Sequence, residues 1–195
     1  MRAILEAIAS GELNAEARLL VSNNRDSAAL GAAEAAGLPW RHISAATAGS
    51  AEAADQAIAE AMADAGAELI VLSGYMRKLG PQTLARYRGR ILNIHPALLP
   101  KHGGQGLYGR RVHEAVRASG DQVTGASIHL VDAGYDTGPV IARREVPVRP
   151  GDTVEDIEAA VREIEPGLFV ETLRRIADGP FHCIMLKVES GGTMN

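Results

Sequence analysis

Residues 90–96 read R-I-L-N-I-H-P and join a hydrophobic strand to a loop rich in proline and glycine. Successive side chains of a strand point to opposite faces, so Asn93 and His95 are expected on the same face. At the carboxyl end of a strand in an open α/β sheet, that face looks into the ligand crevice. A carboxamide there can donate a hydrogen bond to a developing oxyanion, and an imidazole can move a proton. The alternative is that Asn93 caps a turn and His95 is a hydrogen-bonded loop histidine.

The bulk composition fits one domain and argues against several classes of partner. The chain has 195 residues and a formal net charge of −4, which argues against a nucleic-acid-binding surface. Its single cysteine excludes an internal disulfide framework and favours a reducing cytoplasm. The chain opens on an amphipathic helical pattern and not on a signal peptide, and it has no apolar stretch long enough to span a membrane. We therefore expect a cytoplasmic protein with small-molecule partners, as a monomer or a homodimer.

Strand-like apolar runs alternate with helix-like periodic segments along the whole chain. Buried strands read as short continuous apolar runs, and amphipathic helices as apolar residues three and four apart. Strands are predicted at 19–21, 40–43, 69–72, 90–94, 128–131 and 140–148. Helices are predicted at 1–8, 27–36, 51–65, 81–87, 111–118 and from Thr153 onward. This alternation predicts a single α/β domain over residues 1–195, with a mostly parallel sheet and helices on both faces.

The two ends of the chain look like halves of one motif. Residues 184–188 are a strand-like run, and residues 190–195 read S-G-G-T-M-N, a glycine-rich turn. A strand, a glycine-rich turn and a helix N-terminus together make a phosphate-binding nest. The helix stands at residues 1–8, so we expect a circular permutation in which residues 184–195 supply the first strand and the phosphate loop. That strand should lie between the strands ending at Val21 and Leu72. The alternative is a tail without fixed structure.

Two longer motifs carry a resemblance to a known family. I-L-N-I-H-P-A-L-L-P-K at residues 91–101 and D-T-G-P-V-I at residues 136–141 together resemble the folate-dependent phosphoribosylglycinamide (GAR) formyltransferases of purine synthesis. Further matching segments are 72–77, 113–115 and 125–129. The resemblance covers nearly all of the chain if its ends are permuted. It implies a Rossmann-like fold and the transfer of a formyl group from 10-formyltetrahydrofolate, as co-substrate, to the primary amine of GAR, with no metal.

The resemblance implies that three residues take part in catalysis. Asn93 would donate to the oxyanion of a tetrahedral intermediate, and His95 would stabilise the same charge when protonated or help to shuttle a proton. Asp136 would orient His95 and, as a nearby carboxylate, raise the pKa of that histidine. From the residues alone, D-T-G-P is also an ordinary turn sequence. His129, in the strand predicted at 128–131, is interpreted as a structural histidine.

The same resemblance implies the substrate contacts. On the side of GAR, Glu165 would hold the ribose hydroxyls, with an ordinary solvated helix position as its alternative. The matching phosphate-loop residues are Gly191, Gly192, Thr193 and Asn195. The folate would lie between two walls, to which the matching residues are Met76, Arg77, Lys78 and Leu79 on one side and Asp132 and Tyr135 on the other. The glycine-rich run at 103–106 is predicted to be a mobile connector, since no strand-to-helix junction surrounds it.

Three other interpretations stay open. A 10-formyltetrahydrofolate hydrolase uses a related catalytic trio with water as acceptor, but such enzymes usually carry an extra N-terminal regulatory domain. A methionyl-tRNA formyltransferase shares the catalytic layout, but it usually carries a tRNA-binding domain and a basic surface. A catalytically impaired relative that only binds ligands is the third, and the interrupted phosphate loop favours it.

Overall fold

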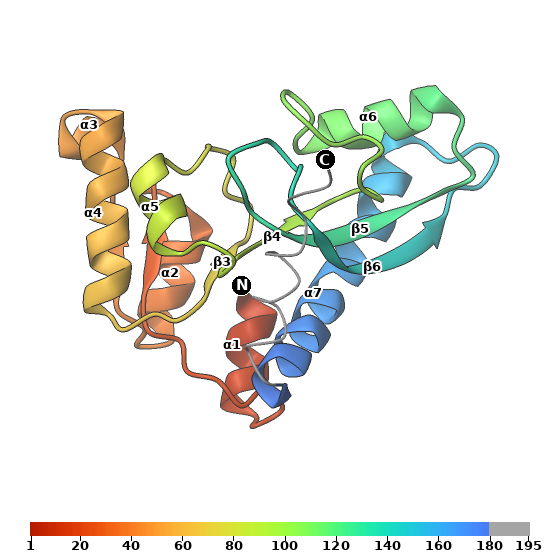
Figure 1. Cartoon of the computed structure of the whole chain (residues 1–195). Coiled ribbons are helices and arrows are strands. Elements are labelled where there is room, and N and C mark those ends of the chain that lie inside the picture. Colours follow the sequence, from red (N-terminus) through yellow and green to blue (C-terminus); the bar gives the residue numbers. More distant parts are fainter. Residues whose placement is uncertain (180–195) are drawn as a thin grey trace, which may run out of the picture.

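The computed structural model describes residues 1–179 and shows an α/β arrangement (Figure 1). Its strands are β1 (Leu20–Ser22), β2 (Trp40–His42), β3 (Ile70–Leu72), β4 (Ile91–His95), β5 (Val123–Leu130) and β6 (Val140–Pro147). Its helices are α1 (Arg2–Ala9), α2 (Ala28–Ala35), α3 (Ala45–Ala48), α4 (Ala51–Asp64), α5 (Pro81–Arg86), α6 (Arg110–Ser119) and α7 (Val154–Asp178). Every element predicted within these residues is present. The short helix α3 and the first half of β5 were not predicted.

Within residues 1–179 the strands form a parallel two-stranded sheet and a mixed four-stranded sheet, where we expected one mostly parallel sheet. β1 pairs with β2 in parallel, and β3 pairs with β4 in parallel. β5 runs antiparallel to both β4 and β6, which completes the order β3-β4-β5-β6. The reason lies partly in the connection between β5 and β6, which is residues 131–139 without a helix. A parallel pair needs a longer crossover, so a short loop turns the chain back on itself.

The strands β1 and β3 do not pair with each other in the part of the chain that the structure describes. The strand predicted between them, at 184–188, and the glycine-rich turn at 190–195 lie outside the described residues, so the permutation stays a prediction. Helix α1 begins beside the carboxyl end of β3, where the ammonium of Met1 donates to the Ser73 hydroxyl at 3.4 Å.

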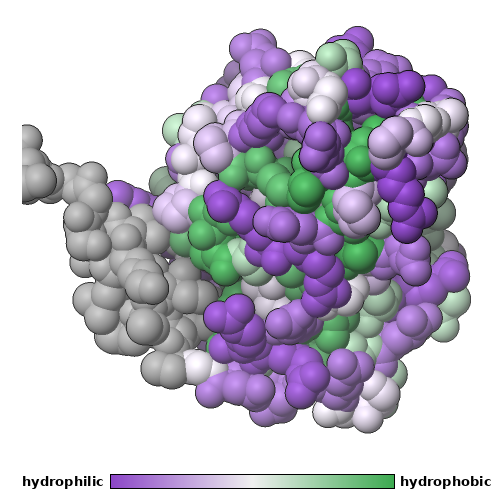
Figure 2. All heavy atoms as spheres, turned by 90° about the vertical axis from the view of Figure 1, so that its right-hand side faces the viewer, coloured by the Kyte–Doolittle hydropathy of each residue, from purple (hydrophilic) through white to green (hydrophobic). Residues whose placement is uncertain are grey.

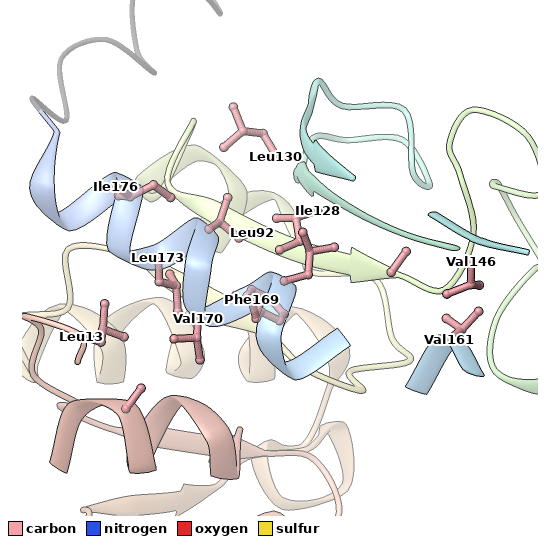
Figure 3. Close-up of a cluster of buried hydrophobic side chains, with 13 residues drawn as sticks. Leu13, Leu92, Ile128, Leu130, Val146, Val161, Phe169, Val170, Leu173 and Ile176 are labelled. Atoms are coloured by element: carbon pink, nitrogen blue, oxygen red, sulfur yellow. The ribbon is translucent and has the colours of Figure 1, made fainter. Parts of the chain in front are cut away.

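Two hydrophobic clusters cover opposite faces of the four-stranded sheet. On one face, Phe169 and Leu173 of α7 belong to one buried cluster with Leu92 of β4 and Ile128 of β5 (Figure 3). All four side chains are buried, and α1 joins the same cluster. On the other face, Ile91 packs with residues that lie before and after α5. Because neighbouring residues of β4 face opposite clusters, Asn93 and His95 share the face of Ile91.

The surface is mainly hydrophilic on the face that holds α6 and the ends of β5 and β6. Figure 2 shows this face, with hydrophobic side chains visible between charged and polar ones near its centre. Across residues 1–179, none of the helices combines the length and the apolar character needed to cross a membrane.

A buried carboxylate of α4 anchors the start of α5, next to a wall of the pocket described below. Asp55 is 5% exposed and accepts hydrogen bonds from the backbone N–H groups of Gln82 at 2.8 Å and Thr83 at 3.1 Å. Gly80 permits this close approach, because a Cβ at that position would overlap the Asp55 carboxylate. The carboxylate thus acts as an N-cap supplied from another helix.

Replacing Asp55 should therefore destabilise the fold. In Asp55→Ala the two backbone N–H groups lose their acceptor, and we expect the free energy of unfolding to fall by about 2 kcal/mol. Urea denaturation followed by circular dichroism measures this change. The control is Asp64→Ala, an exposed carboxylate on the same helix, which should change the free energy by less than about 0.5 kcal/mol. Equal losses in the two variants would contradict the anchoring role.

Candidate active site

A pocket of about 600 Å³ opens at the carboxyl ends of β3 and β4. This volume lies in the range of small-molecule sites. Its walls come from β4 and β5, from the loops that follow β3 and β5, from residues 104–109, from the start of α6 and from one face of α7. The run at 103–106, predicted to be a connector, thus lies beside the pocket.

The structure brings Asn93, His95 and Asp136 together on one side of this pocket. The Nδ1 atom of His95 lies 3.4 Å from Oδ2 of Asp136. The Nδ2 atom of Asn93 lies 3.0 Å from Nε2 of His129. This Nε2 atom of His129 lies 3.4 Å from Oδ1 of Asp136. One carboxylate therefore faces two imidazoles, and the carboxamide is bound to the second of them. We refer to these four residues as the polar cluster.

Strand pairing and one loop place the polar cluster. The antiparallel register sets Asn93 of β4 directly opposite His129 of β5, where side chains of paired residues meet. Asp136 lies in the β5–β6 loop with a left-handed φ of 55°. The next turn passes close to β5 only because residue 138 is glycine, since a Cβ there would overlap the Leu130 carbonyl. The Gly104 N–H donates to Asp136 at 3.0 Å and ties the glycine-rich loop to the cluster.

His129 belongs to the pocket, so its interpretation as a purely structural histidine was incomplete. Its Nδ1–H donates to the Leu130 carbonyl at 3.0 Å, so that in the neutral ring Nε2 accepts from the Asn93 amide. An amide nitrogen has two hydrogens, so Asn93 keeps a second one for a ligand. The signal that identifies His129 is its cross-strand position opposite Asn93, which depends on knowing that β5 runs antiparallel to β4.

The ring of His95 is held at both nitrogens. Its Nε2 lies 2.8 Å from the carbonyl oxygen of His102. A carbonyl only accepts, so Nε2 carries the hydrogen, and Nδ1 is the nitrogen that gains or loses a proton opposite Asp136. The loop after His95 is fixed by the buried Ser127 hydroxyl, which donates to the Ala97 carbonyl at 2.8 Å and accepts from the Leu99 N–H at 3.0 Å.

Burial decides the direction of the His95 pKa. The side chain is almost completely buried, and this desolvation lowers the pKa of His95 below its ordinary 6.5, although the charge of Asp136 and the bond to the His102 carbonyl act to raise it. The expected contribution of Asp136, which raises this pKa, is confirmed, but the loss of solvation outweighs the attraction and the net pKa is lowered. A neutral His95 is the dominant form at neutral pH.

Asp136 shows the opposite balance. Burial acts to raise the pKa of Asp136. The hydrogen bond that His129 donates when its Nε2 is protonated, the bond from the Gly104 N–H and the positive charge of a protonated His95 together bring this pKa below its ordinary 3.8. The carboxylate is therefore ionised at neutral pH. The site combines an ionised carboxylate with a neutral imidazole that is poised to accept a proton.

The two predicted folate walls both line the pocket. Met76, Arg77 and Lys78 are exposed at its rim, and Leu79 is buried beneath them. The ammonium of Lys78 lies 5.2 Å from the centre of the Tyr135 ring. This cation–π contact joins the loop after β3 to the loop after β5.

Asp132 shapes its wall from within. Its carboxylate accepts from the Gly134 N–H at 2.9 Å and from the Thr137 hydroxyl at 2.7 Å. Both bonds are made within the β5–β6 loop, so the Asp132 side chain stabilises a turn, as aspartate side chains commonly do. The loop that carries Tyr135 and Asp136 is thereby held in one shape.

Glu165 of α7 lies in the wall that is nearest to the start of α1. Its side chain faces the pocket and is half-buried, which argues against an ordinary solvated helix position. Burial raises the pKa of Glu165, whereas Arg162 and the Met1 ammonium act to lower it. The predicted phosphate residues at 191–195 lie outside the described residues. Within residues 1–179, no group of three or more His, Cys, Asp or Glu residues is arranged to hold a metal ion.

A carboxamide, two imidazoles and a carboxylate at the strand ends of an α/β sheet make a site for acyl-type transfer. In agreement with this chemistry, the family model described as formyl transferase matches residues 1–173. The chain belongs to the formyl transferase family.

Several similar proteins within this family are named phosphoribosylglycinamide formyltransferase. The Mycobacterium tuberculosis (H37Rv) protein of that name is 41% identical over 177 residues, which are 91% of this chain and 79% of that protein. The chloroplastic Arabidopsis thaliana protein is 34% identical over 178 residues, and the chain spans only 61% of its length. Glycinamide ribonucleotide transformylase 1 from Symbiobacterium toebii, a crystal structure, matches with a TM-score of 0.85 at 35% identity, over 91% of this chain and 82% of that one.

The titration of His95 tests this description of the site. NMR titration of the His95 ring should give a midpoint below 6.5, since burial lowers its pKa. Asp136→Asn removes a charge that raises this pKa, so the midpoint should move to still lower pH. The control is Asp64→Asn, an exposed carboxylate outside the pocket, which should leave the midpoint unchanged. A midpoint that rises in Asp136→Asn would contradict the assigned electrostatics.

Proposed function

We propose that this protein transfers the formyl group of 10-formyltetrahydrofolate to the primary amine of glycinamide ribonucleotide, a step of de novo purine biosynthesis. The observation that supports it most is the meeting of Asn93, His95 and Asp136 in one pocket. The names of the similar proteins point to the same reaction.

The chemistry needs a donor for an oxyanion. The amine of GAR attacks the formyl carbon, and negative charge grows on the formyl oxygen. Asn93 would stabilise that oxygen with the amide hydrogen that His129 does not use. Because the bond to His129 holds the amide plane in place, this donor is oriented before the substrate arrives, which limits the cost of reorganisation.

The reaction also needs an acceptor for a proton. The attacking amine must lose a proton, and the folate nitrogen must gain one as its bond to the formyl carbon breaks. His95 would take the proton at Nδ1, since Nε2 is held by the His102 carbonyl. The ionised Asp136 would stabilise the imidazolium that forms, 3.4 Å away. Because its pKa is lowered, His95 is better suited to accept this proton than to stabilise the oxyanion as a permanently protonated imidazolium.

The two substrates would enter from different sides. The pterin would lie between Met76–Leu79 and the loop that carries Asp132 and Tyr135, where backbone groups are available to read its edge. GAR would lie toward α7, with its ribose hydroxyls at Glu165 and its phosphate near the start of α1. A helix N-terminus favours a phosphate at that place.

We also propose that residues 184–195 complete the single domain as a circular permutation. Two observations support this proposal. Strands β1 and β3 are left unpaired with each other within residues 1–179, and α1 begins at the pocket beside Ser73. A strand between β1 and β3 would lead through Gly191, Gly192, Thr193 and Asn195 to the phosphate. We further propose that the protein works in the cytoplasm as a monomer or a homodimer on small molecules alone, without a metal. The single cysteine of the sequence supports the reducing compartment.

The test of the function is an assay of tetrahydrofolate release with and without GAR. Release that needs GAR supports formyl transfer. Release without GAR supports 10-formyltetrahydrofolate hydrolysis, and the absence of release supports a ligand-binding relative. Asn93→Ala should lower kcat for the GAR-dependent reaction by about 10² to 10³, since it removes the oxyanion donor. The control is Asn14→Ala, an exposed residue outside the pocket, which should keep the wild-type rate.

The place of GAR is tested by Glu165→Gln. Loss of the charge weakens the hydrogen bonds to the ribose hydroxyls, so we expect the KM for GAR to rise about tenfold and the KM for the folate to stay unchanged. Steady-state kinetics with each substrate varied in turn measures both constants. The control is Glu163→Gln, an exposed carboxylate on the same helix. A rise in the folate KM alone would place GAR elsewhere.

A further inference from the structure

We propose that Asp121, which lies outside the pocket, positions His95 through the backbone of His102. The route has two hydrogen bonds. The Asp121 carboxylate bonds the His102 ring, with 2.7 Å between Oδ2 and Nε2. The carbonyl of the same His102 then bonds the His95 ring at 2.8 Å. The inference rests on the proposed formyl transfer for its kinetic test only.

The backbone at His102 needs such support. Its φ is 58°, in the left-handed region that residues other than glycine rarely adopt. A residue stays in that conformation when its surroundings hold it there. The ring of His102 is 11% exposed and is held by Asp121, with the Ser119 hydroxyl at 3.5 Å. The side-chain bond therefore keeps the peptide turned so that its carbonyl points at His95.

Asp121 is itself placed by a helix end. It follows Gly120, which ends α6 in a left-handed conformation. Its carboxylate bonds both His102 and the exposed Lys101. The bond with His102 has the larger effect on the pKa of Asp121, and together the two contacts hold that pKa far below its usual range. The anchor is therefore charged at every pH at which the protein would be assayed.

The consequence for the site is the choice of tautomer. The His102 carbonyl accepts the hydrogen of Nε2, which leaves Nδ1 opposite Asp136 to exchange the proton. If the carbonyl turned away, the neutral ring would place its hydrogen on either nitrogen, and only one of the two tautomers could accept the proton of the amine at Nδ1. Asp121 is thus a positioning residue that acts without touching a substrate.

The kinetic test uses Asp121→Ala, Asp121→Asn and Lys101→Ala in the full chain. Asp121→Ala should lower kcat about tenfold and leave both KM values within about twofold of wild type. Asp121→Asn keeps an oxygen that accepts from His102, so its loss should be smaller. Lys101→Ala removes the other partner of Asp121 and spares His102, so it should keep the wild-type kcat.

A second measurement reads His95 directly. The ¹⁵N shifts of its ring in the ligand-free protein should show hydrogen on Nε2 in wild type and a mixture of tautomers in Asp121→Ala. The spectra of wild type and variant should be recorded at the same pH, because other titratable side chains lie near this ring. These are Asp136, His129, His102 and His113.

The outcomes distinguish the positioning role of Asp121 from the proposed formyl transfer. Wild-type kcat and wild-type ¹⁵N shifts in Asp121→Ala would overturn the inference, and so would an equal loss of kcat in Lys101→Ala. If circular dichroism shows that Asp121→Ala is unfolded, Asp121→Asn decides by the same readouts. If the wild-type protein releases no tetrahydrofolate with GAR, the proposed function fails, whereas the ¹⁵N comparison still decides on the role of Asp121.

Discussion

The antiparallel pairing of β4 with β5 is the constraint on which the active site depends. It sets Asn93 opposite His129 and His95 opposite Ser127. The first pair orients Asn93, the proposed oxyanion donor, and the second places the hydroxyl that fixes the loop after His95. A shift of this register by one residue would turn Asn93 and His95 into the cluster beneath α7. The hydrophobic alternation of Ile91 and Leu92, each buried on its own face of the sheet, opposes such a shift.

The same pairing explains why burial governs the protonation of the site. Strands that are covered on both faces leave little water around His95 and His129, which are both nearly inaccessible. Asp136 enters from a loop and keeps more contact with solvent than they do. The carboxylate can therefore stay ionised while the imidazole stays neutral. In the proposed reaction, His95 would then accept the proton and Asp136 would stabilise the charge that results.

The amino-acid sequence predicts the local features of this site better than the long-range ones. The N-x-H spacing on a strand placed Asn93 and His95 on one face without further knowledge, because the period of a strand is two residues. Asp136 joined them only through the resemblance to a family. The sequence alone favours a structural role for His129, because its partner across the sheet depends on strand direction and register, which no short segment of sequence specifies.

The net lowering of the His95 pKa is a long-range feature of the same kind. A neighbouring carboxylate can be inferred from a motif, whereas desolvation depends on everything that packs around the ring. The direction of the strands in the sheet is likewise not determined by local sequence. Apolar runs indicate strands but do not state their direction, so the parallel pairing of β3 with β4 and the antiparallel pairing of β4 with β5 come from runs that look alike.

The loops around the pocket obtain their shape from single polar side chains. Ser127 holds residues 97–99, Asp132 holds its own loop, and Asp55 holds the segment that starts α5. In each case a carboxylate or hydroxyl bonds backbone groups that no strand or helix satisfies. A formyl group is small and offers few atoms to recognise, so an enzyme that moves it depends on the placement of its own donors and acceptors. Anchors of this kind supply that placement, because they fix the backbone without closing the pocket to its substrates.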